Sequence, residues 1–184
     1  MNLRIFIIFS FIFAYAASPA FCEEPEAWLT IEGGVITVEY ESSVSLKAVN
    51  SKLNRRGMFS NGFFSSESSA DTPEGEVAER LERLLKRAEE ILDMYPPKMK
   101  LVVKIFAEDD SLQDAYFRIF GTRPGYRAFY IHEYGTIYTS EYGISDSVII
   151  HEMAHAIIDN YFSANPPPKV GEILSTYVDM HLDD

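Results

Sequence analysis

The sequence predicts a single α+β domain over residues 23–184, in which a mixed or antiparallel sheet packs against helices. Short segments rich in β-branched and aromatic residues occur at three places along the chain. Between them lie longer segments whose apolar residues recur at the helical period. The length of 184 residues suits one domain, and a composition of 47% hydrophobic and 24% charged residues is ordinary for a globular protein.

The first elements after residue 27 are expected to be a hairpin and a helix. Residues 28–40 form two arms of alternating polarity around Gly33-Gly34, a turn pair that tolerates positive φ. Residues 43–56 are expected to be helical, since their apolar positions recur at helical spacing. Residues 57–75 are rich in Gly and Ser and predict a long loop.

The middle of the chain predicts a helix, a strand, a second helix and a strand pair. Residues 74–95 carry one apolar stripe that ends before Pro96-Pro97. Further elements are expected at residues 101–107 (strand), 111–120 (helix), and 127–131 and 136–139 (strand pair). Five tyrosines recur every four residues around this pair; the pattern predicts packing, with one of them free to reach a functional site: Tyr126, Tyr130, Tyr134, Tyr138 and Tyr142.

The first 22 residues are interpreted as a secretory signal peptide, outside the folded domain. Arg4 precedes an apolar stretch of residues 5–17, which is shorter than the roughly 20 residues that a spanning helix needs. Small residues then permit cleavage before Glu23 or before Phe21. The alternatives are an uncleaved anchor and lipid modification of Cys22, where bulky Phe21 is unfavourable. The chain is therefore expected to be secreted or periplasmic, with no stable membrane insertion after cleavage.

The net charge limits the classes of partner that the chain can bind, and the cysteine content limits what can stabilise its fold. The formal net charge is −12, which repels phosphate backbones, so nucleic-acid binding is not expected. Cys22 is the only cysteine, so cleavage after it leaves no disulfide. An exported chain without disulfides depends on its core, on a metal, or on both.

The motif that carries chemistry lies within residues 145–163, which predict an apolar helix. It reads His151-Glu152-Met153-Ala154-His155. Residues four apart on a helix point in nearly the same direction, so both imidazoles can reach one metal ion. Glu152 need not be a ligand and can act as a general base beside the metal.

A catalytic zinc needs a third protein ligand from elsewhere in the chain. Tyr161 and Ile158 stand where the metzincin class would place its third ligand and its glycine, so that class is excluded. Asp159 lies one turn further along the same helix and is expected at the surface or behind a ligand. After the break at residues 165–168, Glu172 falls in the first turn of a returning helix and is better placed.

With HEMAH followed by Glu-Ile-Leu-Ser-Thr-Tyr, residues 130–184 resemble the gluzincin branch of zinc metallopeptidases, and specifically its small peptidase-MA-like members. Ile173 stands where glycine is common in that branch. The resemblance implies a zincin-like domain whose C-terminal helix carries the third ligand. It implies one Zn²⁺ per chain bound by His151, His155 and Glu172, with Glu152 as base and proton shuttle.

The resemblance also implies a substrate strand and an oxyanion donor. Residues 136–139 would be the edge strand along which a peptide lies. Tyr177 and His181 are the nearest donor candidates in sequence, although Tyr177 is expected to pack and His181 to lie at the surface. Asp179 is a further hypothesis, as the acceptor of an N–H from a zinc-bound histidine.

The leading prediction is a hydrolase that cleaves peptide bonds in a peptide or protein substrate. The alternative is a secreted binding or scaffold module that keeps zinc for stability and has little activity; such a module has no use for Glu152. Hydrolysis of another amide, such as cell-wall material, is a third possibility. The sequence does not specify the oligomeric state.

Overall fold

The computed structural model describes residues 27–53 and 72–183. The segment interpreted as a signal peptide, residues 1–22, lies outside this part of the chain. So do most of the expected loop at 57–75 and the last residues of the helix expected at 43–56. The fold is therefore given for residues 27–53 and 72–183.

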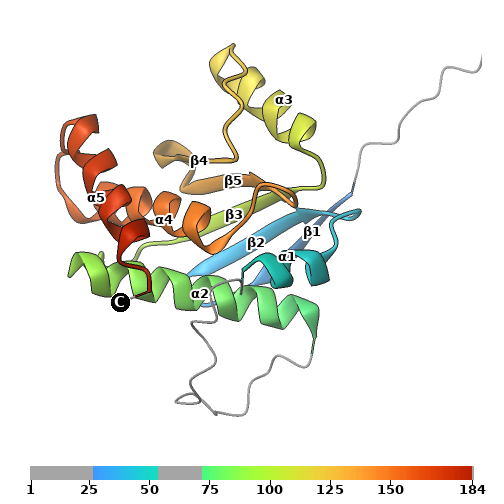
Figure 1. Ribbon diagram of the computed structural model, residues 1–184, viewed down its shortest axis with the longest axis horizontal. Helices are drawn as coiled ribbons and strands as arrows, with labels where there is room; N and C mark the ends of the chain where they lie inside the picture. Colours follow the sequence, from blue (N-terminus) through green and yellow to red (C-terminus); the bar gives the residue numbers. More distant parts are fainter. Residues whose placement is uncertain (1–26, 54–71, 184) are drawn as a thin grey trace, which may run out of the picture.

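A mixed five-stranded sheet forms the centre of the α+β fold (Figure 1). Its spatial order is β1 (Trp28–Glu32), β2 (Ile36–Glu41), β3 (Leu101–Phe106), β5 (Thr136–Ser140) and β4 (Ala128–Ile131). The strands β2, β3 and β5 are parallel, whereas β1 and β4 are antiparallel to their neighbours. The predicted mixed sheet and N-terminal hairpin are confirmed.

The prediction that residues 136–139 form the edge strand is wrong by one position in the sheet. β5, which contains residues 136–139, is hydrogen-bonded on both sides, to β3 and to β4. The edge is instead β4, because the turn of residues 132–134 folds β4 back outside β5. The strand pair was visible in the sequence, but its position relative to β3 depends on long-range pairing.

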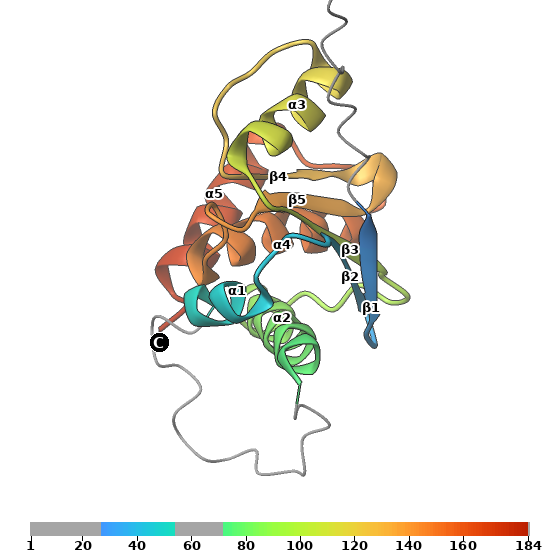
Figure 2. The ribbon, with the colours of Figure 1, turned by 90° about the vertical axis from the view of Figure 1, so that its right-hand side faces the viewer.

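The described residues form five α-helices: α1 (Leu46–Lys52), α2 (Pro73–Leu92), α3 (Asp109–Phe120), α4 (Asp146–Tyr161) and α5 (Pro168–Met180). Each of the five expected helices is present, with α1 starting later than expected because Ser45 caps it. Figure 2 shows α1, α2, α4 and α5 on the same side of the sheet, with α3 on the opposite side.

The main core lies between that side of the sheet and the helices. On β3, the side chains of Leu101, Val103 and Ile105 are fully buried there, as the two-residue period of a strand requires. On the opposite face Val102 and Lys104 are half-buried, and Lys104 pairs with Glu39 at 3.0 Å. A smaller second cluster forms where α3 covers the other face: Phe106, Leu112, Ala115, Phe129 and Ile131.

Helix α4 is the central helix of the core, and its packing sets the directions in which its side chains point. Ser45 and Ser145 cap α1 and α4 in the same way, with the side chain of Ser145 accepting from the amide of Val148. The apolar side of α4 is completely buried against the sheet, α2 and α5, and it consists of Ile149, Ile150, Met153, Ala154, Ala156 and Ile157. With that side occupied, the polar residues of the motif point to the remaining side.

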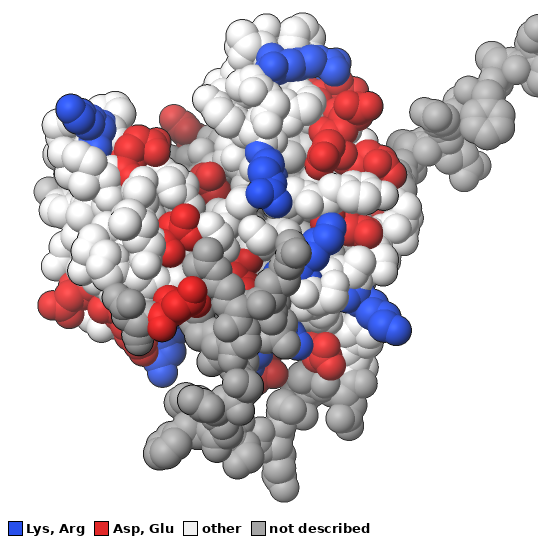
Figure 3. All heavy atoms as spheres, in the orientation of Figure 1, with Lys and Arg blue, Asp and Glu red and all other residues white. Residues whose placement is uncertain are grey.

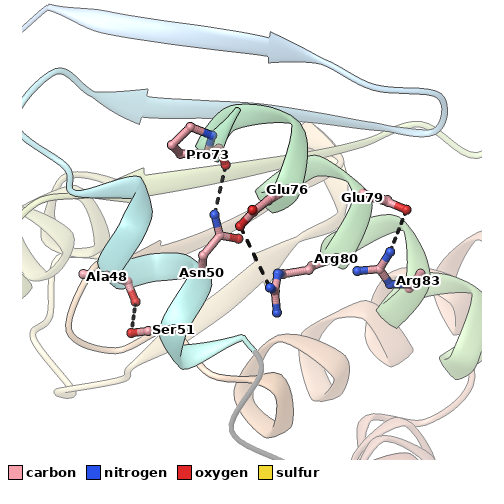
Figure 4. A network of polar contacts seen from close by, with 8 residues as sticks. All are labelled: Ala48, Asn50, Ser51, Pro73, Glu76, Glu79, Arg80 and Arg83. Carbon is pink, nitrogen blue, oxygen red and sulfur yellow. Dashed lines mark hydrogen bonds and ion pairs between the residues drawn. The ribbon is translucent and has the colours of Figure 1, made fainter. Parts of the chain in front are cut away.

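Polar contacts tie the N-terminal elements together (Figure 4). Asn50 on α1 donates to the carbonyl of Pro73 at 3.0 Å, which joins α1 to the start of α2. Further along α2, Glu82 accepts from the amides of Val35 and Ile36 at 2.7 and 2.9 Å. These bonds hold the β1–β2 hairpin on α2, on which α4 also packs.

The tyrosine repeat does not form one packed row. Tyr126, Tyr134 and Tyr142 are more than half exposed, because they lie in the connections on either side of the strands. Tyr138 and Tyr130 are half-buried on neighbouring strands. The packing prediction is therefore wrong for three of the five, and Tyr130 is the one that reaches the site described next.

Candidate metal centre

Two histidines on α4 and one glutamate on α5 converge. His151 and His155 are one helical turn apart, and their ring centroids are 5.1 Å from each other. Glu172 is the fifth residue of α5, which begins at Pro168 after the proline break; the expectation that it falls in the first turn is wrong, because the helix starts before Val170. Because α5 packs back along α4, this residue is brought against the exposed edges of both imidazoles.

The distances among these three groups fit a zinc ion. Glu172 Oε2 is 3.6 Å from His151 Nε2, and Glu172 Oε1 is 3.5 Å from His155 Nε2. The three ligand atoms all lie within 4.8 Å of one another. Tetrahedral zinc with bonds of about 2.0–2.1 Å holds its ligand atoms about 3.4 Å apart. The donor set His₂Glu is also one that zinc accepts with an open fourth position.

The exposure of the three groups leaves that open position accessible. The side chain of Glu172 is 64% exposed, whereas those of His151 and His155 are 27% and 22% exposed. Burial lowers the pKa of His155, which favours the neutral imidazole that a metal requires; the charge of Glu172 acts in the opposite direction. The cluster is therefore anchored from the core side and open toward solvent.

Glu152 is held beside this cluster with a strongly shifted acidity. Burial raises the pKa of Glu152 to about 7; the backbone of Tyr130 hydrogen-bonds to the carboxylate and lowers the pKa, while the charge of Glu172 raises it. Near neutral pH this carboxyl group is thus close to equally divided between its two protonation states. A group in that condition can both accept and return a proton.

A cavity of about 420 Å³ adjoins the cluster. Its walls come from β4 and the turn after it, from α4, and from the start of α5, and they include Glu152, His155, Gly171 and Glu172. Gly171 lies against the His155 imidazole, where a Cβ would make an ordinary van der Waals contact at 3.5 Å from Nδ1. The cavity gives a substrate access to the base and to the cluster at the same time.

Tyr130, His132 and Asp159 form a second polar group on the cavity wall. The Tyr130 hydroxyl is 3.4 Å from His132 Nδ1, and His132 Nδ1 is 3.9 Å from Asp159 Oδ2. Burial, reinforced by the charge of Asp159, raises the pKa of Tyr130 to about 12, so its hydroxyl keeps its proton. Burial also raises the pKa of Asp159, against the effect of His132.

Sequence reasoning missed His132 and left Tyr130 unassigned. The only signal for His132 was a histidine in the polar turn after a predicted strand, and nothing local placed that turn against α4. Asp159 faces His132 and the cavity and is not one of the three convergent ligands. The expectation that Asp159 lies at the surface or behind a ligand stays a prediction.

The donor candidates on α5 point elsewhere. Tyr177 stacks on His181 with a centroid distance of 4.0 Å, and His181 Nδ1 lies 2.8 Å from the Tyr177 carbonyl oxygen. Tyr177 is 47% exposed and packs on His181 at the surface of α5. Within the described part of the chain, Asp179 Oδ1 is buried without a hydrogen-bond partner and contacts neither histidine of the motif, so its expected role as an N–H acceptor stays a hypothesis.

The class that fold and site define is an α+β domain with a candidate His-His-Glu metal centre at the open edge of a mixed sheet. No family model, curated protein or solved structure matches the chain. The geometry of the centre is therefore the feature of the chain that indicates a function.

Proposed function

We propose that this chain is a zinc-dependent metallopeptidase of the gluzincin type, with a zincin-like fold. The observation that carries the proposal is the convergence of His151, His155 and Glu172 within ligand distance of one another, next to a cavity that also contains Glu152. A structural zinc site has four protein ligands and is closed, whereas this cluster has three and faces solvent. Glu152, which is not in the ligand set, has a use only in catalysis.

Each residue at the site has a part in peptide hydrolysis. A bound Zn²⁺ would lower the pKa of water and polarise the carbonyl of the scissile bond. Glu152 accepts the proton of the attacking water and returns it to the leaving nitrogen. The Tyr130 hydroxyl and the His132 imidazole line the same cavity and offer donors to the carbonyl oxygen as charge develops there.

The substrate is proposed to lie along β4. This strand is hydrogen-bonded to β5 on one side only, and Tyr130 and Ile131 place it on the cavity wall. An extended peptide can add to such an edge by main-chain hydrogen bonds. A peptide added at β4 would lie on the wall of the cavity that also contains Glu152 and Glu172.

The proposal also covers the export of the chain and the kind of partner that it binds. Residues 1–22 are proposed to direct the chain to the outside of the cell or to the periplasm. Within the described residues, no helix is long and apolar enough to span a membrane. Acidic and basic side chains are interspersed over the described surface in Figure 3, with no continuous basic area on that face, and a peptide is a better partner than nucleic acid for such a surface.

Metal analysis combined with two variants tests the proposal. The purified wild type is expected to hold one zinc per chain and to cleave peptides. Glu152→Gln should keep the zinc and lose turnover, whereas Glu172→Ala should lose both. A folded wild type that takes up no zinc when it is offered would refute the proposal. Equal turnover of wild type and Glu152→Gln would instead favour the zinc-stabilised scaffold.

A further inference from the structure

Helix α5 is apolar on two opposite faces. Its inner face packs on the core through Gly171, Ser175 and Val178, which are buried. On its outer face, Ile173 is 59% exposed and Met180 is 73% exposed. A surface helix normally has one apolar face, so the outer one indicates a contact that the described residues do not make among themselves.

The outer face forms a groove that reaches the metal centre. The groove measures about 430 Å³, and almost all of its surface is apolar. Ile173, Tyr177 and Met180 line this groove, and so does Glu172, which also lines the cavity at the metal cluster. Since Glu172 is also a candidate zinc ligand, whatever occupies this groove lies directly beside the metal centre.

The length of the groove matches a short stretch of extended peptide. From Glu172 to Met180 the helix rises about 12 Å, at about 1.5 Å per residue. An extended peptide covers this distance with about four residues, at about 3.3 Å each. A face about 12 Å long on a helix about 10 Å wide offers on the order of 120 Å², far below the roughly 800 Å² per partner of a stable protein interface. A second copy of the chain is therefore a poorer occupant than a peptide.

We infer that the outer face of α5 binds an apolar segment of the substrate, within about four residues of the scissile bond. The inference rests on the proposed function, because it takes the occupant from the peptide that reaches the zinc. It makes the substrate class more specific: peptides or unfolded protein segments with large aliphatic or aromatic side chains to one side of the cleavage point. The selectivity lies in Ile173, Tyr177 and Met180, outside the ligand set.

Binding, measured without turnover, tests this inference. The zinc-loaded Glu152→Gln protein is titrated with two capped octapeptides of alanine and lysine, one with leucine and one with serine at the same two alternate positions. The leucine peptide should bind at least about 10-fold more tightly, as burial of large aliphatic side chains requires. Its binding should also shift the methyl resonances of Ile173 and Met180.

Two further substitutions separate the groove from a general apolar effect. Ile173→Ser in the same background should remove the preference for leucine while the zinc content stays unchanged. Val170→Ser is the matched control, because Val170 is an exposed apolar residue of the same helix that does not line the groove; it should keep the preference. Equal binding of the two peptides, or a preference that survives Ile173→Ser, overturns the inference.

The remaining outcomes distinguish this inference from the proposed function. Cleavage of the leucine peptide by the wild type is measured separately. A groove that binds leucine through Ile173 in a protein without turnover refutes the peptidase and supports the groove. Cleavage without any preference for leucine supports the peptidase and refutes the groove. A wild-type dimer that Met180→Asp dissociates would show that a second copy covers this face, and would also refute the inference.

Discussion

Replacing Glu152 by glutamine is expected to stabilise the metal-free protein at pH 8 and to leave its stability unchanged at pH 4. The wild-type carboxyl group is half-buried on the cavity wall, and burial raises its pKa in the folded protein from 4.5 to about 7. The folded state therefore binds a proton more tightly than the unfolded state does. Between pH 4.5 and 7 the free energy of unfolding falls as pH rises, because folding must then proceed with a buried charge.

The size of the expected stabilisation follows from the shift in the pKa of Glu152. A difference of one pKa unit corresponds to about 1.4 kcal/mol, so a rise from 4.5 to about 7 corresponds to about 3 kcal/mol. Below pH 4.5 both states hold the proton and the penalty is absent; above pH 7 it is complete. Glutamine has nearly the same shape, still accepts from the backbone of Tyr130, and carries no charge at any pH.

Urea unfolding with a chelator present, from pH 4 to pH 8, measures this difference. The free energy of unfolding of Glu152→Gln minus that of wild type should grow from near zero to about 3 kcal/mol. Glu108→Gln is the matched control, because Glu108 is exposed at the start of α3; its difference should stay flat. A Glu152→Gln difference that is flat across this range would refute the argument that Glu152 is buried beside the cluster.

Three other perturbations test the centre and the core. Zinc at 100 times its dissociation constant should raise the free energy of unfolding of wild type by about 2.7 kcal/mol; Glu172→Gln should lose most of this gain, as thermal melts with and without zinc would show. Tyr130→Phe should keep the zinc and reduce kcat more than it raises KM, and an unchanged kcat would exclude the hydroxyl as a donor. Ile150→Ala should destabilise the protein by about 2–5 kcal/mol in chemical unfolding, because Ile150 is fully buried on the core side of α4; a cost below 1 kcal/mol would contradict that packing.

Local patterns were sufficient for the elements and for the ligand candidates. The apolar stripe of α2 and the alternation of β3 follow from the helical and strand periods, which neighbouring residues express by themselves. The two histidines of the motif share a side of α4 for the same reason, because four residues make about one helical turn. The proline break before α5 indicated a returning helix that carries Glu172, and the structure brings Glu172 to both imidazoles.

Long-range pairing decided the rest. The turn after β4 folds that strand to the outside of β5, so the edge beside the cavity is β4, and no local pattern specifies which of two paired strands faces outward. The same arrangement brings His132 Nδ1 to 3.9 Å from Asp159 Oδ2, although the two residues are 27 positions apart in the sequence.

The sequence by itself thus determined which residues can bind a metal and on which helices they lie, because ligand spacing on a helix is a local property. The tertiary structure decided what surrounds them. The burial that shifts the pKa of Glu152, the cavity wall with Tyr130 and His132, and the outward apolar face of α5 all depend on how helices and strands distant in sequence pack together. Burial and electrostatic environment are sums over such distant neighbours, and they exist only once the chain has folded.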